Sequence, residues 1–90
     1  MARRRKCPEW WEWELDLELD HLREQMVRRK FNETDLRAML ERATGFRQDD
    51  EPGRWLVDTT RNRQPWAVVV EPQRAEERLL VITAYKVEPS

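Results

Sequence analysis

The sequence has one cysteine, Cys7, and one histidine, His21, among its 90 residues. A single cysteine cannot form an internal disulfide bond, and one cysteine with one histidine is too few for a dedicated zinc site. The composition therefore predicts no metal site. It also fits a reducing cytoplasm, which is the location we expect.

Long apolar runs and the common cofactor motifs are missing as well. The stretch 3–6 is basic, like the start of a signal peptide, but no apolar run follows it, and nothing approaches the roughly 18 residues of a membrane span. The chain also lacks a glycine-rich phosphate loop, a Walker lysine and a serine nucleophile elbow. We expect no membrane segment and no small-molecule cofactor, with residues 1–8 as a flexible basic arm.

The size and charge of the chain fit one small domain. A chain of 90 residues buries only roughly 60 to 65% of its unfolded surface, which leaves room for one core. Charged and apolar residues each make up 39% of the sequence, a very soluble balance that still supports folding. The net charge of −1 neither requires nor excludes a nucleic-acid partner. We predict a single α+β domain over residues 9–90.

The strongest strand pattern covers residues 79–87. Side chains alternate across a strand, so three apolar residues share the face that we expect to meet the helices: Leu80, Ile82 and Ala84. The other face ends with Thr83 and Tyr85, two hydroxyl groups on one side. They are either ordinary strand residues or part of a site.

Acidic and apolar residues alternate from Glu9 to Asp20. This period of two predicts a strand with one buried face and one acidic face. A helix is the alternative, because Trp11, Leu15 and Leu19 also fall on one helical stripe. We favour the strand, because five consecutive alternations discriminate better than helix propensity.

Two helices and three further strands are expected after this segment. Asp20 would cap a helix that begins at His21, and Asn32 with Asp35 would cap a second helix that ends at Gly45. Strand-like runs at 55–60, 66–71 and 79–87 are separated by short polar loops, which predicts an antiparallel meander. The predicted architecture is α+β, with an N-terminal strand and two helices packed on one face of a three- to four-stranded antiparallel sheet.

Polar residues of the first predicted helix are candidates for a site. Histidine suits acid–base chemistry near neutral pH, so His21 is either catalytic or a structural residue at a helix start. Gln25 and Arg29 fall on the same side of the helix. Arg29 also lies close to the apolar stripe, so its guanidinium should reach an anion or a carboxylate such as Asp58 or Glu71.

Basic and aromatic residues are candidates for nucleic-acid contacts. A positive rim for phosphates would consist of Arg28, Lys30, Arg61 and Arg63. Three tryptophans are candidates for stacking on a base: Trp10, Trp55 and Trp66. The alternatives are solvated loop cations and tryptophans that pack in the core. DNA binding ranks lower than RNA binding, because no predicted helix has a basic face for reading bases.

Several of these motifs occur together in one family. They are His21–Phe31, Gly53–Trp55, Arg63–Trp66 and Val81–Tyr85. Over residues 10–88 the chain resembles the bacterial domain-of-unknown-function family 4258. That family looks like part of the superfamily of metal-independent ribonuclease toxins of the barnase, EndoU, colicin and RelE type. The resemblance implies two helices followed by a four-stranded antiparallel sheet.

The resemblance also implies a site and a reaction. The site would combine His21 and Arg29 of the first helix with Thr83 and Tyr85 of the last strand. The reaction would be RNA cleavage by attack of a ribose 2′-hydroxyl on the neighbouring phosphate, with no metal or cofactor, and an antitoxin would be the expected partner. Relatives often carry an arginine where this chain has Gln25, so a degenerate, inactive relative is the alternative.

A second hypothesis is a non-catalytic interaction module. The acidic, tryptophan-rich segment 9–20 would then be an adhesive edge for a protein partner or for a second copy in a homodimer. The two hypotheses differ in what they require of the structure. A nuclease needs the four candidate side chains to meet around one space, whereas an interaction module does not.

Overall fold

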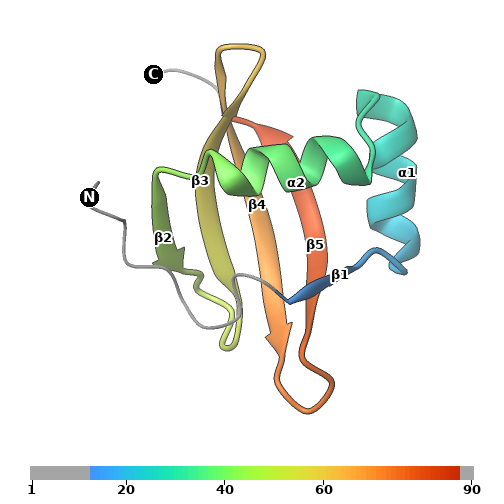
Figure 1. Ribbon diagram of the computed structural model, residues 1–90, viewed down its shortest axis with the longest axis vertical. Coiled ribbons are helices and arrows are strands. Elements are labelled where there is room, and N and C mark those ends of the chain that lie inside the picture. The colour runs from blue at the N-terminus through green and yellow to red at the C-terminus, as the bar shows by residue number, and fades with distance from the viewer. Residues whose placement is uncertain (1–12, 88–90) are drawn as a thin grey trace.

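The computed structural model describes residues 13–87, which form two helices and five strands (Figure 1). In chain order these are β1 (Glu14–Asp16), α1 (Asp20–Arg29), α2 (Glu33–Glu41), β2 (Gly45–Gln48), β3 (Trp55–Arg61), β4 (Gln64–Gln73) and β5 (Arg78–Lys86). The α+β class is as predicted. The basic arm at 1–8 and the start of the acidic segment at 9–12, including Trp10, lie outside the described residues.

The five strands form one mixed sheet in the order β1-β5-β4-β3-β2. Strands β2 to β5 pair antiparallel as a meander, but β1 pairs parallel to β5, with Leu15 opposite Leu79. The prediction of a purely antiparallel sheet with three or four strands is therefore wrong. The chain between β1 and β5 contains two helices and three strands, so it allows either orientation, and side-chain alternation does not distinguish between them.

Strand β2 was not predicted from the sequence. We expected Gly45 to end the second helix. Instead α2 ends at Glu41, and Gly45 begins a strand whose residues pair with β3. This strand has only four residues, two of them exposed and polar, so it has no clear hydrophobic period. Pairing with β3 determines it, rather than its own sequence.

The helix starts differ in how well the sequence predicted them. Asn32 and Asp35 form the expected capping box of α2, with two reciprocal hydrogen bonds of 2.9 Å. At α1, however, Asp20 is the first helical residue, and the cap is Leu19, which makes no side-chain cap bond. The predicted cap at Asp20 is therefore wrong by one residue. Of the segment predicted as a strand, the structure describes residues 13–20, and within these the strand covers the three residues of β1.

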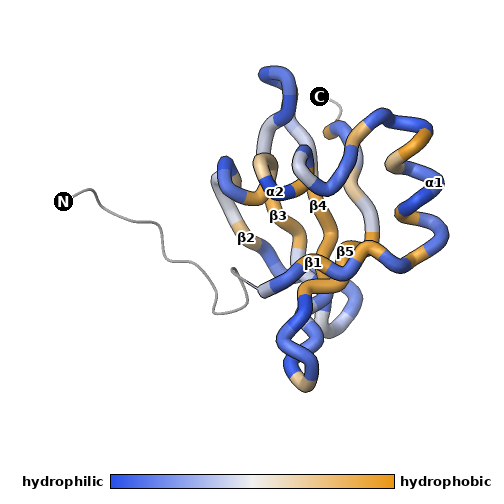
Figure 2. Tube along the Cα trace, turned by 45° about the vertical axis from the view of Figure 1, so that its right-hand side comes forward, coloured by the Kyte–Doolittle hydropathy of each residue, from blue (hydrophilic) through white to orange (hydrophobic). Residues whose placement is uncertain are grey.

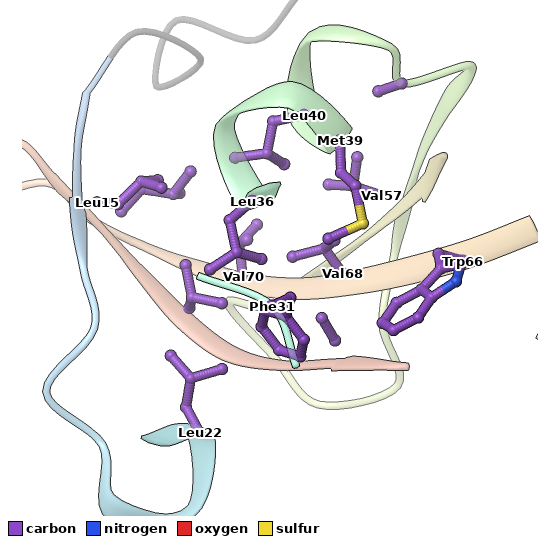
Figure 3. Packing of buried hydrophobic residues seen from close by; sticks show 14 residues of the cluster. Leu15, Leu22, Phe31, Leu36, Met39, Leu40, Val57, Trp66, Val68 and Val70 are labelled. Atoms are coloured by element: carbon purple, nitrogen blue, oxygen red, sulfur yellow. The ribbon is translucent and has the colours of Figure 1, made fainter. Parts of the chain in front are cut away.

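The helices take different positions on the sheet (Figure 1). Helix α2 crosses one face and contacts β3, whereas α1 stands beside the sheet and contacts β5. Hydrophobic segments gather in β3, β4 and β5, while most of the hairpin loops are hydrophilic (Figure 2). The core between α2 and the sheet includes Leu22 from α1, Leu36, Met39 and Leu40 from α2, and Val57, Val68 and Val70 from the strands (Figure 3). No helix of the described residues is long and apolar enough to cross a bilayer.

A β-bulge changes which residues of β5 face the helices. Val70 pairs with Val81 but Val69 pairs with Thr83, so Ile82 is an extra residue in β5. The core therefore takes Leu79 and Val81 before the bulge and Ala84 after it. Our expectation that Leu80 and Ile82 share the core face with Ala84 is wrong. Alternation beyond the bulge directs Thr83 and Tyr85 to the face opposite α2.

Candidate functional site

Three polar side chains on α1 form a row along one side of the helix. His21, Gln25 and Arg29 are spaced four residues apart, so successive members lie one turn apart on nearly the same side. The neighbouring apolar row begins at Leu22, which is fully buried in the core. The polar row therefore runs along the border between the core and the open face of the sheet, beside β5.

Gln25 is the centre of a hydrogen-bond network that joins α1 to β5. Its side chain is 8% exposed. Its Oε1 lies 2.7 Å from Nη1 of Arg29 and 2.6 Å from Oγ1 of Thr83. Its Nε2 lies 3.0 Å from Nε2 of His21. Three of the four predicted catalytic residues thus meet through Gln25, which satisfies its own buried amide in the process.

Arg29 makes no ion pair with the carboxylates that we considered. Besides Gln25, its Nη1 donates to the carbonyl oxygen of Ala84 at 2.7 Å. Asp58 instead binds Arg47 at 2.9 and 3.0 Å, and Glu71 binds Arg54 at 3.3 Å. The interpretation of Arg29 as a partner of Asp58 or Glu71 is therefore wrong.

The guanidinium of Arg29 consequently keeps donors for a ligand. The side chain is half-buried, and among residues 13–87 no carboxylate lies within ion-pair distance of it. Arginine has five N–H donors, and Nη1 supplies both of the bonds described above. The donors on Nε and Nη2 remain for an anion.

A pocket of about 420 Å³ lies where α1 ends beside the end of β5. Its lining residues are Arg29, Trp66, Tyr85 and Lys86. The pocket thus combines two cations, a phenol hydroxyl and an indole. Arg29 and Tyr85 are two of the four side chains that the nuclease hypothesis expects to meet around one space. His21 and Thr83 are not part of the lining and connect to it through Gln25 and Arg29.

The predicted nucleic-acid contacts divide into exposed and engaged residues. Arg28, Lys30 and Arg63 are exposed to solvent. Arg61 is engaged: it donates to the carbonyl oxygen of Lys30 at 2.8 Å, approaches Asp35 at 3.6 Å, and lies 5.3 Å from the ring centre of Trp66. Arg61 therefore ties the end of α1 and the start of α2 to the sheet.

Trp66 is held too tightly to be a simple stacking platform. Its side chain is 7% exposed, and Phe31 packs edge-on against it at 5.9 Å while Arg61 covers its face. A base stacking on this ring would have to displace Arg61. The part of Trp66 that borders the pocket is better suited to an apolar contact with a sugar or with the edge of a base.

The open face next to Tyr85 contains a further charged pair. The sheet register aligns Tyr85 with Ala67, Asp58 and Gly45 in one row across four strands. Asp58 raises the pKa of the Arg47 guanidinium by its hydrogen bond and then by its charge, and Tyr85 adds a smaller effect in the same direction. Tyr85 therefore lies within electrostatic reach of this pair. Arg47 stays charged throughout the physiological range.

Two residues of the site were not among the predicted site residues. Lys86 follows Tyr85 directly at the end of β5 and reaches the same pocket. Gln25 was placed on the same side of the helix as Arg29 but was given no role in the site, although its spacing of four residues from both His21 and Arg29 indicated a contact with each. Within residues 13–87, no three His, Cys, Asp or Glu side chains are arranged to hold a metal ion.

Comparison with known proteins identifies the family. No significant match was found among curated proteins or among solved structures. A family model for a domain of unknown function, DUF4258, matches residues 19–86. The match covers more than half of the chain, from the start of α1 to the end of β5, and contains His21, Arg29, Thr83 and Tyr85. The chain therefore belongs to the DUF4258 family.

Proposed function

We propose that this domain cleaves RNA without a metal ion, at the pocket lined by Arg29, Tyr85 and Lys86. The observation that carries the proposal is the half-buried guanidinium of Arg29, which has no carboxylate partner among the described residues. An unpaired charge at such a position is costly, and an anionic ligand removes that cost. Phosphate matches the planar fork of a guanidinium in both charge and geometry.

The pocket has the size and polarity for part of a nucleotide. Its volume of about 420 Å³ lies in the range of roughly 300 to 1,000 Å³ that is usual for small-molecule sites. Arg29 and Lys86 supply positive charge, Tyr85 supplies a hydroxyl, and Trp66 supplies an apolar edge. RNA is the polymer we propose, because it provides its own nucleophile and is abundant in the cytoplasm, the location expected from the sequence.

The proposed reaction is transfer of the phosphoryl group within the RNA strand. The 2′ oxygen forms a bond to phosphorus and the bond from phosphorus to the 5′ oxygen breaks, which gives a 2′,3′-cyclic phosphate and a free 5′-hydroxyl. Overall one proton leaves the 2′ oxygen and one reaches the 5′ oxygen. No metal or other co-reactant is needed to balance this step.

The chain's side chains would have separate roles in that step. Arg29 and Lys86 would neutralise the charge that grows on the phosphate oxygens, and the hydroxyl of Tyr85 would donate a hydrogen bond to them. His21 lies outside the pocket lining and would supply a nitrogen that donates to a substrate oxygen or accepts a proton from it. Thr83 donates its hydroxyl proton to Gln25, so its role is to position Gln25 rather than to bind phosphate.

Purified protein is expected to cut RNA in the presence of EDTA and to leave 2′,3′-cyclic phosphate ends. The reason is that none of the proposed roles belongs to a metal ion. The measurement is gel electrophoresis of a labelled oligoribonucleotide, with phosphatase treatment to identify the ends. A His21→Ala variant purified in parallel controls for contaminating nuclease. RNA that stays intact, or equal cutting by His21→Ala, would contradict the proposal; RNA bound but not cut would indicate a degenerate relative.

The interaction hypothesis now concerns the outer edge of β1. In the described part of the acidic segment, Leu15 is buried in the core, and Glu14 and Asp16 lie 4.0 and 3.8 Å from Arg78. No other described strand pairs with the far side of β1. We propose that an antitoxin or a second copy would add a strand there. Light scattering should then find dimers or a complex; a monomer at every concentration counts against a homodimer.

A further inference from the structure

We infer that Gln25 is a positioning residue that holds neutral His21 with its proton on Nδ1, so that His21 acts as a hydrogen-bond donor and not as a general base. The tautomer follows from hydrogen bonds within the protein alone. The effect on RNA rests on the proposed function, and the two parts have separate tests.

Arg29 determines which atom of the Gln25 amide is the oxygen. A guanidinium only donates, so the Gln25 atom 2.7 Å from Nη1 of Arg29 must be the amide oxygen. Thr83 also donates to this oxygen, at 2.6 Å, which occupies both of its lone pairs. Both donors come from positions that the fold determines, one on α1 and one on β5. The orientation of the amide is therefore set from outside His21.

The orientation of Gln25 in turn determines the protonation of His21. The remaining Gln25 atom is the NH₂ group, which only donates, and it lies 3.0 Å from Nε2 of the imidazole. Nε2 must therefore offer a lone pair. A neutral imidazole has one proton, which is then on Nδ1.

The other two states of His21 conflict with this network. A proton on Nε2, in the second neutral tautomer or in the imidazolium ion, would place two donors opposite each other at 3.0 Å. Rotating the Gln25 amide by 180° would let its oxygen accept from Nε2–H of His21. It would also place the NH₂ group next to Arg29, which cannot accept a hydrogen bond. Because Gln25 is almost fully buried, water does not readily replace a lost partner.

The consequence for the reaction is that His21 presents an N–H group to the substrate. Its side chain is exposed, so Nδ1 is available to RNA while Nε2 is occupied. A neutral imidazole donor stabilises negative charge as it develops on oxygen, without giving up its proton. The proton from the 2′ oxygen then passes to solvent water, and the 5′ oxygen receives one from solvent water.

Replacement of Gln25 by glutamate should move the proton of neutral His21 from Nδ1 to Nε2. A carboxylate at position 25 has the same length and only accepts, so Gln25→Glu keeps Arg29 and Thr83 as donors and accepts from Nε2–H. The proton of neutral His21 then moves to Nε2, and Nδ1 gains a free lone pair. Gln25→Met has neither a donor nor an acceptor in place of the amide, so it should favour neither tautomer of His21. Arg28→Gln is the matched control, because it changes an exposed residue of the same helix.

Long-range ¹H–¹⁵N correlation spectra of the full chain test the tautomer directly. His21 is the only histidine, so both imidazole nitrogens are assigned without ambiguity. At alkaline pH, where imidazole is neutral, we expect the wild type and Arg28→Gln to show a protonated Nδ1 and an unprotonated Nε2. Gln25→Glu should show the reverse, and Gln25→Met a mixture. A wild type with Nε2 protonated, or with the mixture seen in the urea-unfolded chain, would overturn the assignment.

Cleavage of an oligoribonucleotide tests the second part. If His21 acts as a donor held by Gln25, His21→Ala and Gln25→Glu should each lower kcat by roughly 10²-fold with little change in KM, which is the usual effect of removing one such donor. The double variant should be no slower than the slower single variant. If kcat of the double variant fell by the product of the two single losses, His21 and Gln25 would act independently, and the proposed coupling between them would be overturned. If the wild type does not cut RNA, the role on RNA fails with the proposed function, whereas the spectra still decide the tautomer.

Discussion

Replacement of Arg29 by glutamine is expected to lower kcat/KM for RNA cleavage by roughly 10²- to 10³-fold. The substitution removes the half-buried cation that faces the pocket but keeps a polar side chain at the same point on α1. Charge on the phosphate oxygens would then develop opposite a neutral group. Initial rates on a short labelled oligoribonucleotide, measured below KM at fixed salt, give the ratio directly.

Arg28→Gln is the matched control for this experiment. It makes the same change of charge at the next residue, but on an exposed side chain that is not part of the pocket lining. We expect a loss of less than about threefold, because solvent and salt screen exposed charges. Arg29→Lys separates charge from geometry, since lysine lacks the planar fork. Equal losses for Arg28→Gln and Arg29→Gln would mean that only overall charge matters.

Replacement of Leu22 by alanine is expected to lower the free energy of unfolding by about 2 to 5 kcal/mol. Leu22 is 0% exposed and packs from α1 into the core between the helices and the sheet (Figure 3). The smaller side chain removes buried apolar surface and leaves a cavity. The measurement is urea denaturation followed by tryptophan fluorescence, with the slope m compared to confirm a two-state transition.

Val27 provides the control for Leu22 on the same helix. Its side chain is 80% exposed, so Val27→Ala loses little burial, and alanine is the better helix former. We expect a change of less than about 0.5 kcal/mol. The comparison also tests how α1 is held, since the same helix positions His21, Gln25 and Arg29. Similar losses for both variants would mean that α1 does not contribute its inner face to the core.

The elements with clear periodicity were predictable from sequence. The capped helix α2, the three strands of the meander and the α+β class each follow from local patterns that agree with the final fold. Strand β2 did not follow, because its four residues are determined by pairing with β3. The parallel pairing of β1 did not follow either, because nothing in residues 14–16 encodes the direction of a distant neighbour.

The site was predictable in part for a related reason. Helical spacing placed His21, Gln25 and Arg29 on one side, and the structure shows this row beside β5. The partner of Arg29 was not predictable, because it is a backbone carbonyl, that of Ala84, which every residue possesses. Gln25 was undervalued because an amide has no charge. Its importance comes from being able to donate and accept at once.

The extra residue in β5 lets one strand supply apolar side chains to the core and hydroxyl groups to the opposite face of the sheet. In a ladder without the offset, Ile82 would lie opposite Val69, and Thr83 and Tyr85 would turn to the same side as Leu79 and Val81. Both hydroxyl groups would then be enclosed beneath α2. With the extra residue, both hydroxyl groups face away from α2, so that Thr83 reaches Gln25 and Tyr85 lines the pocket. A comparison of residue types alone does not reveal this change of register.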